Sequence, residues 1–145
     1  MYSAIPGGGW FCVTFINYED RSNEIVIVNN RDELIDFYNK HKDDIFISYN
    51  GRQYDTGIFK GILDGMKVGY VNDKLIKEGK KPFQVVKNAK NYPLNDYDAI
   101  LKDKSLKQLE AFMGDDIRET EVDFNIDRPL TDEEIRQTLY YNRHD

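Results

Sequence analysis

Two short stretches of this sequence carry side chains suited to chemistry. The first is the polar group from Asn50 to Asp55, which follows an apolar run and includes Tyr54. The second is Tyr141 with Asp145, which are four residues apart and share one face of a helix. Ligands of layered α/β domains bind at the carboxyl ends of strands, so Asp55 stands where a strand would deliver a carboxylate to a site. Each stretch also has a plainer interpretation: Asp55 as a helix-starting residue, and Tyr141 with Asp145 as an exposed pair.

The first half of the chain predicts the elements that position Asp55. Aromatic and β-branched runs on either side of a polar turn indicate a β-hairpin over residues 10–30. Helical spacing follows over residues 31–42, with Asn30 as its cap and Glu33 three residues on. A short buried strand over residues 43–50 then leads to a helix over residues 55–64, which Gly65 ends.

The second half predicts the helix that carries Tyr141. Thr131 with Glu134 forms a capping box at its start, and the helix runs to the chain end. A second capping box, Ser105 with Gln108, predicts a short helix that Gly114 closes. A helical turn or two is expected over residues 72–79, and residues 80–100, which contain Pro82 and Pro93, look partly irregular. Helices alternating with strands after an initial hairpin favour an α/β layered domain with a mixed sheet.

Composition predicts one domain over residues 1–145 without a membrane-spanning segment. The 145 residues include enough apolar and aromatic side chains for one core, and no apolar run approaches the ~20 residues of a membrane span. The sequence shows no secretory signal pattern. Its one cysteine, Cys12, cannot form an internal disulfide and fits a reducing compartment. We therefore expect a cytoplasmic protein with no membrane partner.

Charge is distributed unevenly along the chain. The formal net charge is −6, which does not favour a polyanion as partner. Residues 67–90, however, contain seven lysines and two acids, whereas residues 115–145 are rich in acids. The lysines are Lys67, Lys74, Lys77, Lys80, Lys81, Lys87 and Lys90. They predict either a basic face for a polyanion or a solvated lysine-rich helix.

Taken together, the two stretches resemble motifs of a known nuclease family. Asn50-x-x-x-Tyr54-Asp55 resembles the second motif of the DEDD superfamily of 3′–5′ exonucleases. Tyr141-x-x-x-Asp145 resembles the third motif of its tyrosine-bearing branch, and the order and separation of the two also suit the family. The segment from residue 105 to the chain end is similar to exonuclease-like domains of phage replication proteins. The resemblance extends from about Trp10 to the end of the chain.

The resemblance implies a ribonuclease H-like fold, with a mixed sheet flanked by helices, and two-metal phosphodiester hydrolysis with Mg²⁺ or Mn²⁺. It makes Asp55 and Asp145 metal ligands, because hard cations prefer carboxylate oxygens. It makes Tyr141 the residue that orients the attacking water. Asn50 and Tyr54 become substrate-binding positions, with Tyr54 packed beneath the site. The implied partner is single-stranded DNA in the cytoplasm of a bacterial host, with a replication or host protein as a further partner.

The sequence departs from the family at its first motif. An Asp-x-Glu pair belongs just before the stretch that matches "WFCVTF", yet residues 1–9 contain no carboxylate, and the first acid is Glu19. The resemblance is therefore to an exonuclease domain shortened at both edges of its site, since Asp145 is also the last residue of this sequence. Fewer acidic ligands weaken the binding of hard divalent ions, so we expect impaired catalysis.

Three interpretations stay open at this point. The chain is a metal-dependent 3′–5′ exonuclease with a weakened or rebuilt site, or it is a catalytically inactive module of the same fold that binds nucleic acid or a protein. Alternatively, it is an unrelated small α/β interaction protein whose two motifs match by chance. The missing Asp-x-Glu separates the first interpretation from the second, and the order of strands tests the third.

Overall fold

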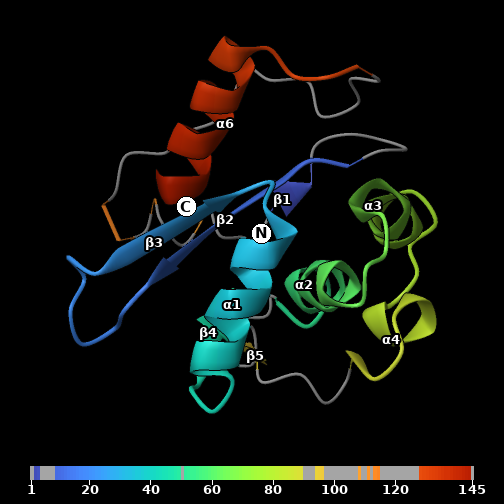
Figure 1. The fold of residues 1–145 in the computed structure, drawn as a ribbon, viewed down its shortest axis with the longest axis horizontal. Helices are drawn as coiled ribbons and strands as arrows, with labels where there is room; N and C mark the ends of the chain where they lie inside the picture. The colour runs from blue at the N-terminus through green and yellow to red at the C-terminus, as the bar shows by residue number, and fades with distance from the viewer. Residues whose placement is uncertain are drawn as a thin grey trace.

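The chain folds as mixed α/β, with helices on both faces of a small antiparallel sheet (Figure 1). The computed structural model describes residues 2–3, 9–49, 51–89, 94–96, 108, 111, 113–114 and 128–144. The predicted positions Asn50, Ser105 and Asp145 lie outside this set. Within it, no helix has the length and apolar character that crossing a bilayer requires.

The predicted hairpin is confirmed. Strand β2 (Phe11–Ile16) pairs antiparallel with β3 (Glu24–Val28), with Val13 opposite Ile27. The polar turn is held by Asp20, whose Oδ1 accepts from the amide and the hydroxyl of Ser22 at 3.1 and 2.5 Å. On its other edge β2 pairs antiparallel with β1 (Tyr2–Ser3), so the sheet order is β1–β2–β3.

Strand β2 is apolar on both faces, and each face contacts a different core. Successive side chains of a strand point to opposite sides, so Phe11 and Val13 face one way and Cys12 the other. Phe11 and Val13 belong to the larger core, whereas Cys12 and Trp10 belong to a smaller cluster. Both strand faces are therefore covered by other elements.

Helices α1 (Arg31–His41) and α2 (Asp55–Leu63) cover the first face. Leu34 of α1 and Phe59 of α2 are fully or almost fully buried in the larger core. Both predicted helices are confirmed, including the cap of α1, where the Glu33 amide donates to Asn30 Oδ1 at 3.0 Å. Gly65, which follows α2, has a φ of +79°, a conformation that glycine adopts without strain.

Helices α3 (Val68–Ile76) and α4 (Pro82–Val85) pack on α2. A Cβ atom on Gly61 would lie 3.0 Å from Val71, and one on Gly57 would lie 3.0 Å from Leu75. The glycines of α2 thus allow α3 to approach closely. The predicted helical turn over residues 72–79 was misplaced, because α3 begins earlier, and α4 was not predicted at all.

Helix α6 (Asp132–His144) covers the second face of the sheet. Leu130, Ile135 and Leu139 pack against the smaller cluster. The predicted capping box is confirmed: the Thr131 amide donates to Glu134 Oε2 at 2.9 Å, and the Glu134 amide donates to Thr131 Oγ1 at 3.2 Å.

A second, parallel pair of strands lies apart from the antiparallel sheet. Strand β4 (Phe46–Ser48) pairs with β5 (Leu94–Asp96), with Ile47 opposite Asn95. The mixed α/β class is thus confirmed. The described strands form two sheets rather than the one mixed sheet that the sequence predicted, because β1 and β4 do not pair among the described residues.

Candidate functional site

The polar group predicted at the end of a strand lies between β4 and α2. Asp55 is the first residue of α2 and is half-buried, while Tyr54 occupies the N-cap position without a capping hydrogen bond from its side chain. The amides of Thr56 and Ile58 donate to the carbonyls of Gly51 and Tyr54 at 2.8 and 3.1 Å. The Asp55 carboxylate therefore stands at the positive end of the helix, where a negative charge is stabilised.

The loop before Asp55 is closely packed around Gly51. A Cβ atom on Gly51 would lie 1.8 Å from Ser48 Oγ and 3.7 Å from Asp55 Oδ2. The side chains of Ser48 and Asp55 thus converge on the position that glycine leaves open. Any larger residue at position 51 would displace the Ser48 hydroxyl.

Two hydrogen bonds join this loop to the lysine-rich segment. The hydroxyl of Tyr54 donates to Asn72 Oδ1 of α3 at 2.8 Å. Lys81 Nζ, just before α4, donates to Gln53 Oε1 at 2.7 Å. The segment with seven lysines therefore adjoins the carboxyl end of β4, where Arg52 is exposed.

Part of the positive charge of this segment is paired within it. Glu78 lies 2.8 Å from Lys74 and 3.6 Å from Lys80, and Asp73 lies 3.1 Å from Lys77. The hydrogen bond between Lys74 and Glu78 raises the pKa of the lysine and lowers the pKa of the glutamate. The local net charge over residues 67–90 is still +5, so the rest of the chain carries −11.

Two aromatic rings lie exposed among these lysines. Phe83 of α4 is 53% exposed and Tyr70 of α3 is 51% exposed. Lys74 Nζ lies 5.5 Å from the centroid of the Tyr70 ring, within the range of a cation–π contact. Phe83 is thus on the surface, while Tyr92 and Tyr97, the next aromatic residues along the chain, lie outside the described residues. We call Arg52, Lys81 and Phe83, with the exposed lysines of the same segment, the basic face.

The third-motif tyrosine lies on the other side of the antiparallel sheet. Tyr141 is half-buried near the end of α6. Its neighbours bind the hairpin: Thr14 Oγ1 donates to Asn142 Oδ1 at 2.8 Å, and Arg143 Nε donates to Glu24 Oε1 at 2.5 Å. Helices α2 and α6 pack on opposite faces of the sheet, so its thickness separates their bodies (Figure 1).

The donor set for a divalent ion is small in the described part of the chain. There, no group of three or more His, Cys, Asp or Glu residues could hold a metal ion. Asp55 contributes one carboxylate, and Asp145 lies outside the described residues. One carboxylate does not match the several oxygen ligands that a pair of Mg²⁺ or Mn²⁺ ions requires.

Sequence reasoning found the loop and the lysines separately but missed the contact between them. The lysine-rich composition of residues 67–90 was the sequence signal for a basic surface. No local sequence pattern predicts that Lys81 contacts Gln53. In comparisons with known proteins, the chain matches no family model, no curated protein and no solved structure.

Proposed function

We propose that this chain is a ribonuclease H-like domain of the DEDD type, tyrosine branch, whose function is to bind single-stranded DNA. The observation that carries the proposal is the hydrogen bond from Lys81 to Gln53, which brings the basic face to the strand-end loop before Asp55. Proteins that bind single-stranded nucleic acid commonly combine a positively charged groove along the nucleic-acid backbone with exposed aromatic rings on which bases stack.

The arrangement of strands supports this fold. The antiparallel order β3–β2–β1 and the parallel pair β4–β5 correspond to the two halves of one mixed sheet of order 3-2-1-4-5, with β1 and β4 left unpaired among the described residues. Helices already cover both faces of the antiparallel part. This joined order is the one that a ribonuclease H-like sheet requires, and the loop before Asp55 would then lie at its edge.

Binding would rest on charge and stacking together. Lys67 and Lys87 are exposed and lie in the same segment as Lys81, so they can neutralise phosphates and release counterions. Phe83, which is 53% exposed, can stack on a base without selecting a sequence. The rest of the chain is acidic and repels DNA. This repulsion would confine the bound DNA to the basic face.

The residues described here do not fit the two-metal set that the family resemblance implies, since Asp55 is the one carboxylate at the loop. Asp55 instead stabilises the first turn of α2 and, with Ser48, fixes the shape of the loop that bears Arg52 and Gln53.

The test is fluorescence anisotropy with a labelled oligothymidylate of about 20 nucleotides between about 50 and 200 mM salt. We expect Lys81→Gln to lower the salt slope by about 0.7, the loss of one phosphate contact, while Lys40→Gln on α1 leaves it unchanged. Phe83→Ala should weaken binding by roughly 5- to 100-fold, the range for one stacked base. Tyr18→Ala, which removes a more exposed ring (85% against 53%) from the hairpin turn, is the control.

Three outcomes would contradict the proposal. One is the absence of binding at low salt, and another is an equal loss of binding in Lys40→Gln or Tyr18→Ala. The third comes from incubating the DNA with Mg²⁺ or Mn²⁺. Stepwise shortening that disappears in Asp55→Ala would establish an exonuclease and replace the binding function proposed here.

A further inference from the structure

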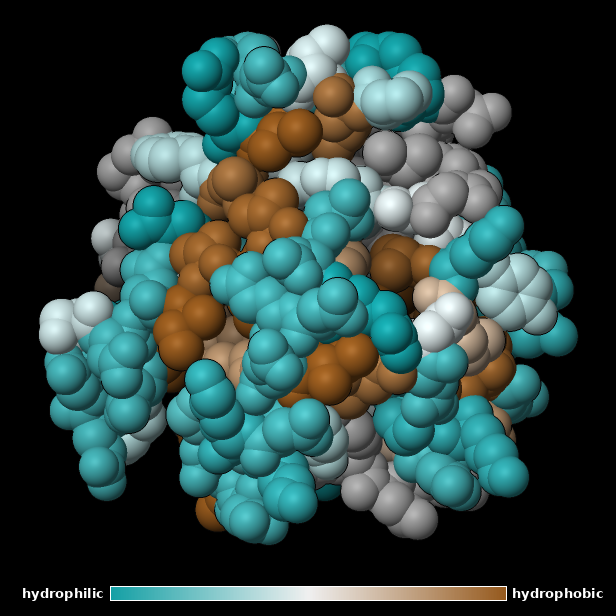
Figure 2. Space-filling model, in the orientation of Figure 1, coloured by the Kyte–Doolittle hydropathy of each residue, from teal (hydrophilic) through white to brown (hydrophobic). Residues whose placement is uncertain are grey.

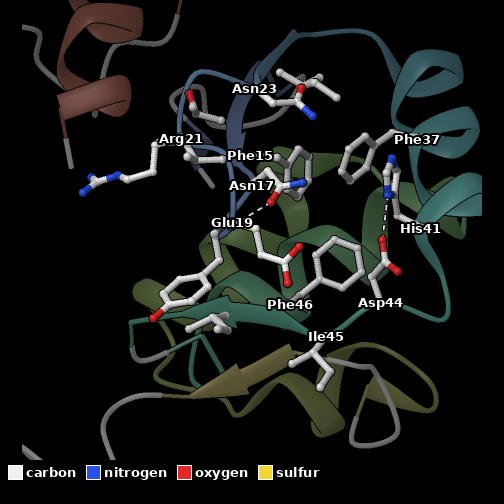
Figure 3. A pocket seen from close by; sticks show the side chains of 15 residues that line it. Phe15, Asn17, Glu19, Arg21, Asn23, Phe37, His41, Asp44, Ile45 and Phe46 are labelled. Atoms are coloured by element: carbon white, nitrogen blue, oxygen red, sulfur yellow. Dashed lines mark hydrogen bonds and ion pairs between the residues drawn. The ribbon is translucent and has the colours of Figure 1, made fainter.

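A cleft of about 830 Å³ opens between the end of the β2–β3 hairpin and the start of β4 (Figure 3). This volume lies in the ordinary range of ligand sites, roughly 300 to 1,000 Å³. Its floor is aromatic: the Phe15 and Phe37 rings stack at 4.0 Å, and the Phe46 ring meets Phe15 edge-on at 5.9 Å. We call it the strand cleft, because it lies between strands β2 and β4.

The rim of the strand cleft is apolar and exposed. Ile16 is 47% exposed, Ile45 74% and Ile47 50%. Such side chains are unusual in one place on a surface unless something covers them. On the face that Figure 2 presents, other apolar side chains also remain visible among the polar ones.

One wall of the cleft is an open strand edge. The amide of Asn17 donates to the Asn23 carbonyl, and the amide of Asn29 donates to the Phe11 carbonyl. Backbone hydrogen bonds alternate along an antiparallel pair. The backbone N–H and C=O groups of the odd-numbered residues of β2 therefore bond to β3, and those of the even-numbered residues point to the opposite edge of β2. Among the described residues, β1 pairs on that edge with Phe11 and Cys12 only, which leaves the backbone groups of Thr14 and Ile16 without a described strand partner beside the cleft.

The opposite wall is a second strand edge. Among the described residues, β4 has β5 as its partner on one side only. Ile45, Phe46 and Ile47 line the cleft from its other side. A strand between β2 and β4 would therefore find hydrogen-bonding groups on both sides, and it would meet Phe15 and Phe46 on one face and the rim isoleucines on the other.

The charge at the cleft is negative. Two acids, Glu19 and Asp44, and one base, Arg21, line it, which is a formal net charge of −1, and Figure 3 shows the Glu19 carboxylate turned toward the cavity. The Asp44 carboxylate lies 2.8 Å from His41 Nδ1. A basic side chain entering the cleft would thus meet Glu19 first.

We propose that the strand cleft binds an extended peptide strand of a partner protein by β-augmentation, antiparallel to β2. The peptide is apolar on both faces and carries a lysine or arginine that reaches Glu19. Its main chain would complete the edges of β2 and β4, and its side chains would enter the aromatic floor and cover the isoleucine rim. This site is separate from the basic face and does not depend on DNA binding.

The probe is a fluorescent synthetic peptide, acetyl-Lys-Val-Ile-Val-Thr-Val-amide, measured by anisotropy with the full chain. We expect saturable binding that weakens about tenfold in Ile16→Asn and in Ile47→Asn, because each removes an apolar contact of the rim. Ile76→Asn, at a 63% exposed isoleucine of α3, is the matched control and should bind normally. The same peptide with N-methyl groups at alternate residues should not bind, since it lacks the amide donors of one edge.

Other results would overturn the proposal. It fails if the peptide does not bind at about 1 mM, or if the N-methylated peptide binds equally well. It also fails if sedimentation shows a dimer that Ile47→Asn dissociates, because a second copy would then be the occupant. A peptide with glutamine in place of its lysine should bind the wild-type chain more weakly than the original peptide does. The Glu19→Gln variant should bind the two peptides equally well. If the glutamine peptide loses the same affinity for both proteins, Glu19 does not contact the peptide lysine.

Discussion

Arg31 ties the start of α1 to the end of α2, and its removal should loosen the larger core. Its Nε donates to the Ile62 carbonyl and its Nη2 to the Leu63 carbonyl, both at 2.8 Å. These carbonyls belong to the last turn of α2, where helix hydrogen bonds end and a positive charge is favoured. Arg31→Met keeps a similar stem but removes both donors and the charge.

The magnitude follows from those contacts. A hydrogen bond involving a charged group contributes about 1.5 to 3 kcal/mol when it is sheltered, and a charge at a helix end about 0.3 to 1 kcal/mol. Because Arg31 is exposed on the surface, water can hydrogen-bond to the Ile62 and Leu63 carbonyls when the arginine is removed, which offsets much of the lost stabilisation. We expect Arg31→Met to lower the free energy of unfolding by about 1 to 2 kcal/mol. Arg31→Lys keeps the charge and one donor, so it should recover about half of this loss.

The assay is urea unfolding followed by circular dichroism, with the midpoint and slope fitted for each variant. Arg21→Met, at an exposed arginine of the hairpin turn, is the matched control for losing one surface charge. If Arg31→Met and Arg21→Met unfold at the same urea concentration, the contact between α1 and α2 does not stabilise the chain and the reasoning is refuted.

Three further predictions concern a carboxylate, a thiol and a glycine. The hydrogen bonds from Arg128 and Thr131 lower the pKa of Glu134 from 4.5 to about 2, so Glu134→Gln should lose the stability that wild type keeps above pH 4.5. That difference should shrink as the pH falls from 4.5 toward 2 in thermal unfolding, and a constant difference would contradict it. Burial raises the pKa of the Cys12 thiol to about 12, so a thiol reagent at pH 8 should label Cys12 only after unfolding, and rapid labelling of the native chain would contradict its burial. Gly9→Ala should destabilise by more than about 1 kcal/mol, because its Cβ would lie 2.7 Å from Val68 Cβ at a φ of +80°, and an unchanged midpoint would refute this.

Local patterns predicted those elements whose causes are local. The hairpin follows from its apolar alternation and polar turn, and the start of α6 follows from the reciprocal bonds of Thr131 and Glu134. Helix α4 was missed because Pro82 suggested an interruption, although proline is favoured in the first turn of a helix. Helix α3 was misplaced because its start is set by packing of Val68 and Val71 rather than by a cap.

The candidate site was predictable only in part for a similar reason. Position along the chain identified Asp55 as the residue after a strand, and the structure agrees that it begins α2, but Ile45 and Ile47 are exposed where the sequence predicted a buried strand. The hydrogen bonds from Lys81 to Gln53 and from Tyr54 to Asn72 arise when three segments pack together, and no spacing in the sequence encodes them. Likewise, the strand cleft arises from two strand edges that the described residues leave unpaired, which a one-dimensional pattern of apolar residues does not reveal.

The two-sided burial of β2 has a consequence for synthesis on the ribosome. The face with Trp10 and Cys12 is covered by α6, and Thr14 bonds to Asn142, a residue 128 positions later. The hairpin is complete once Val28 has been made, but 114 further residues must follow before Asn142 exists. At roughly 5 to 20 residues per second, that takes roughly 6 to 23 s. During this interval the nascent hairpin carries an uncovered apolar face, so it should be a substrate for chaperones that bind emerging chains.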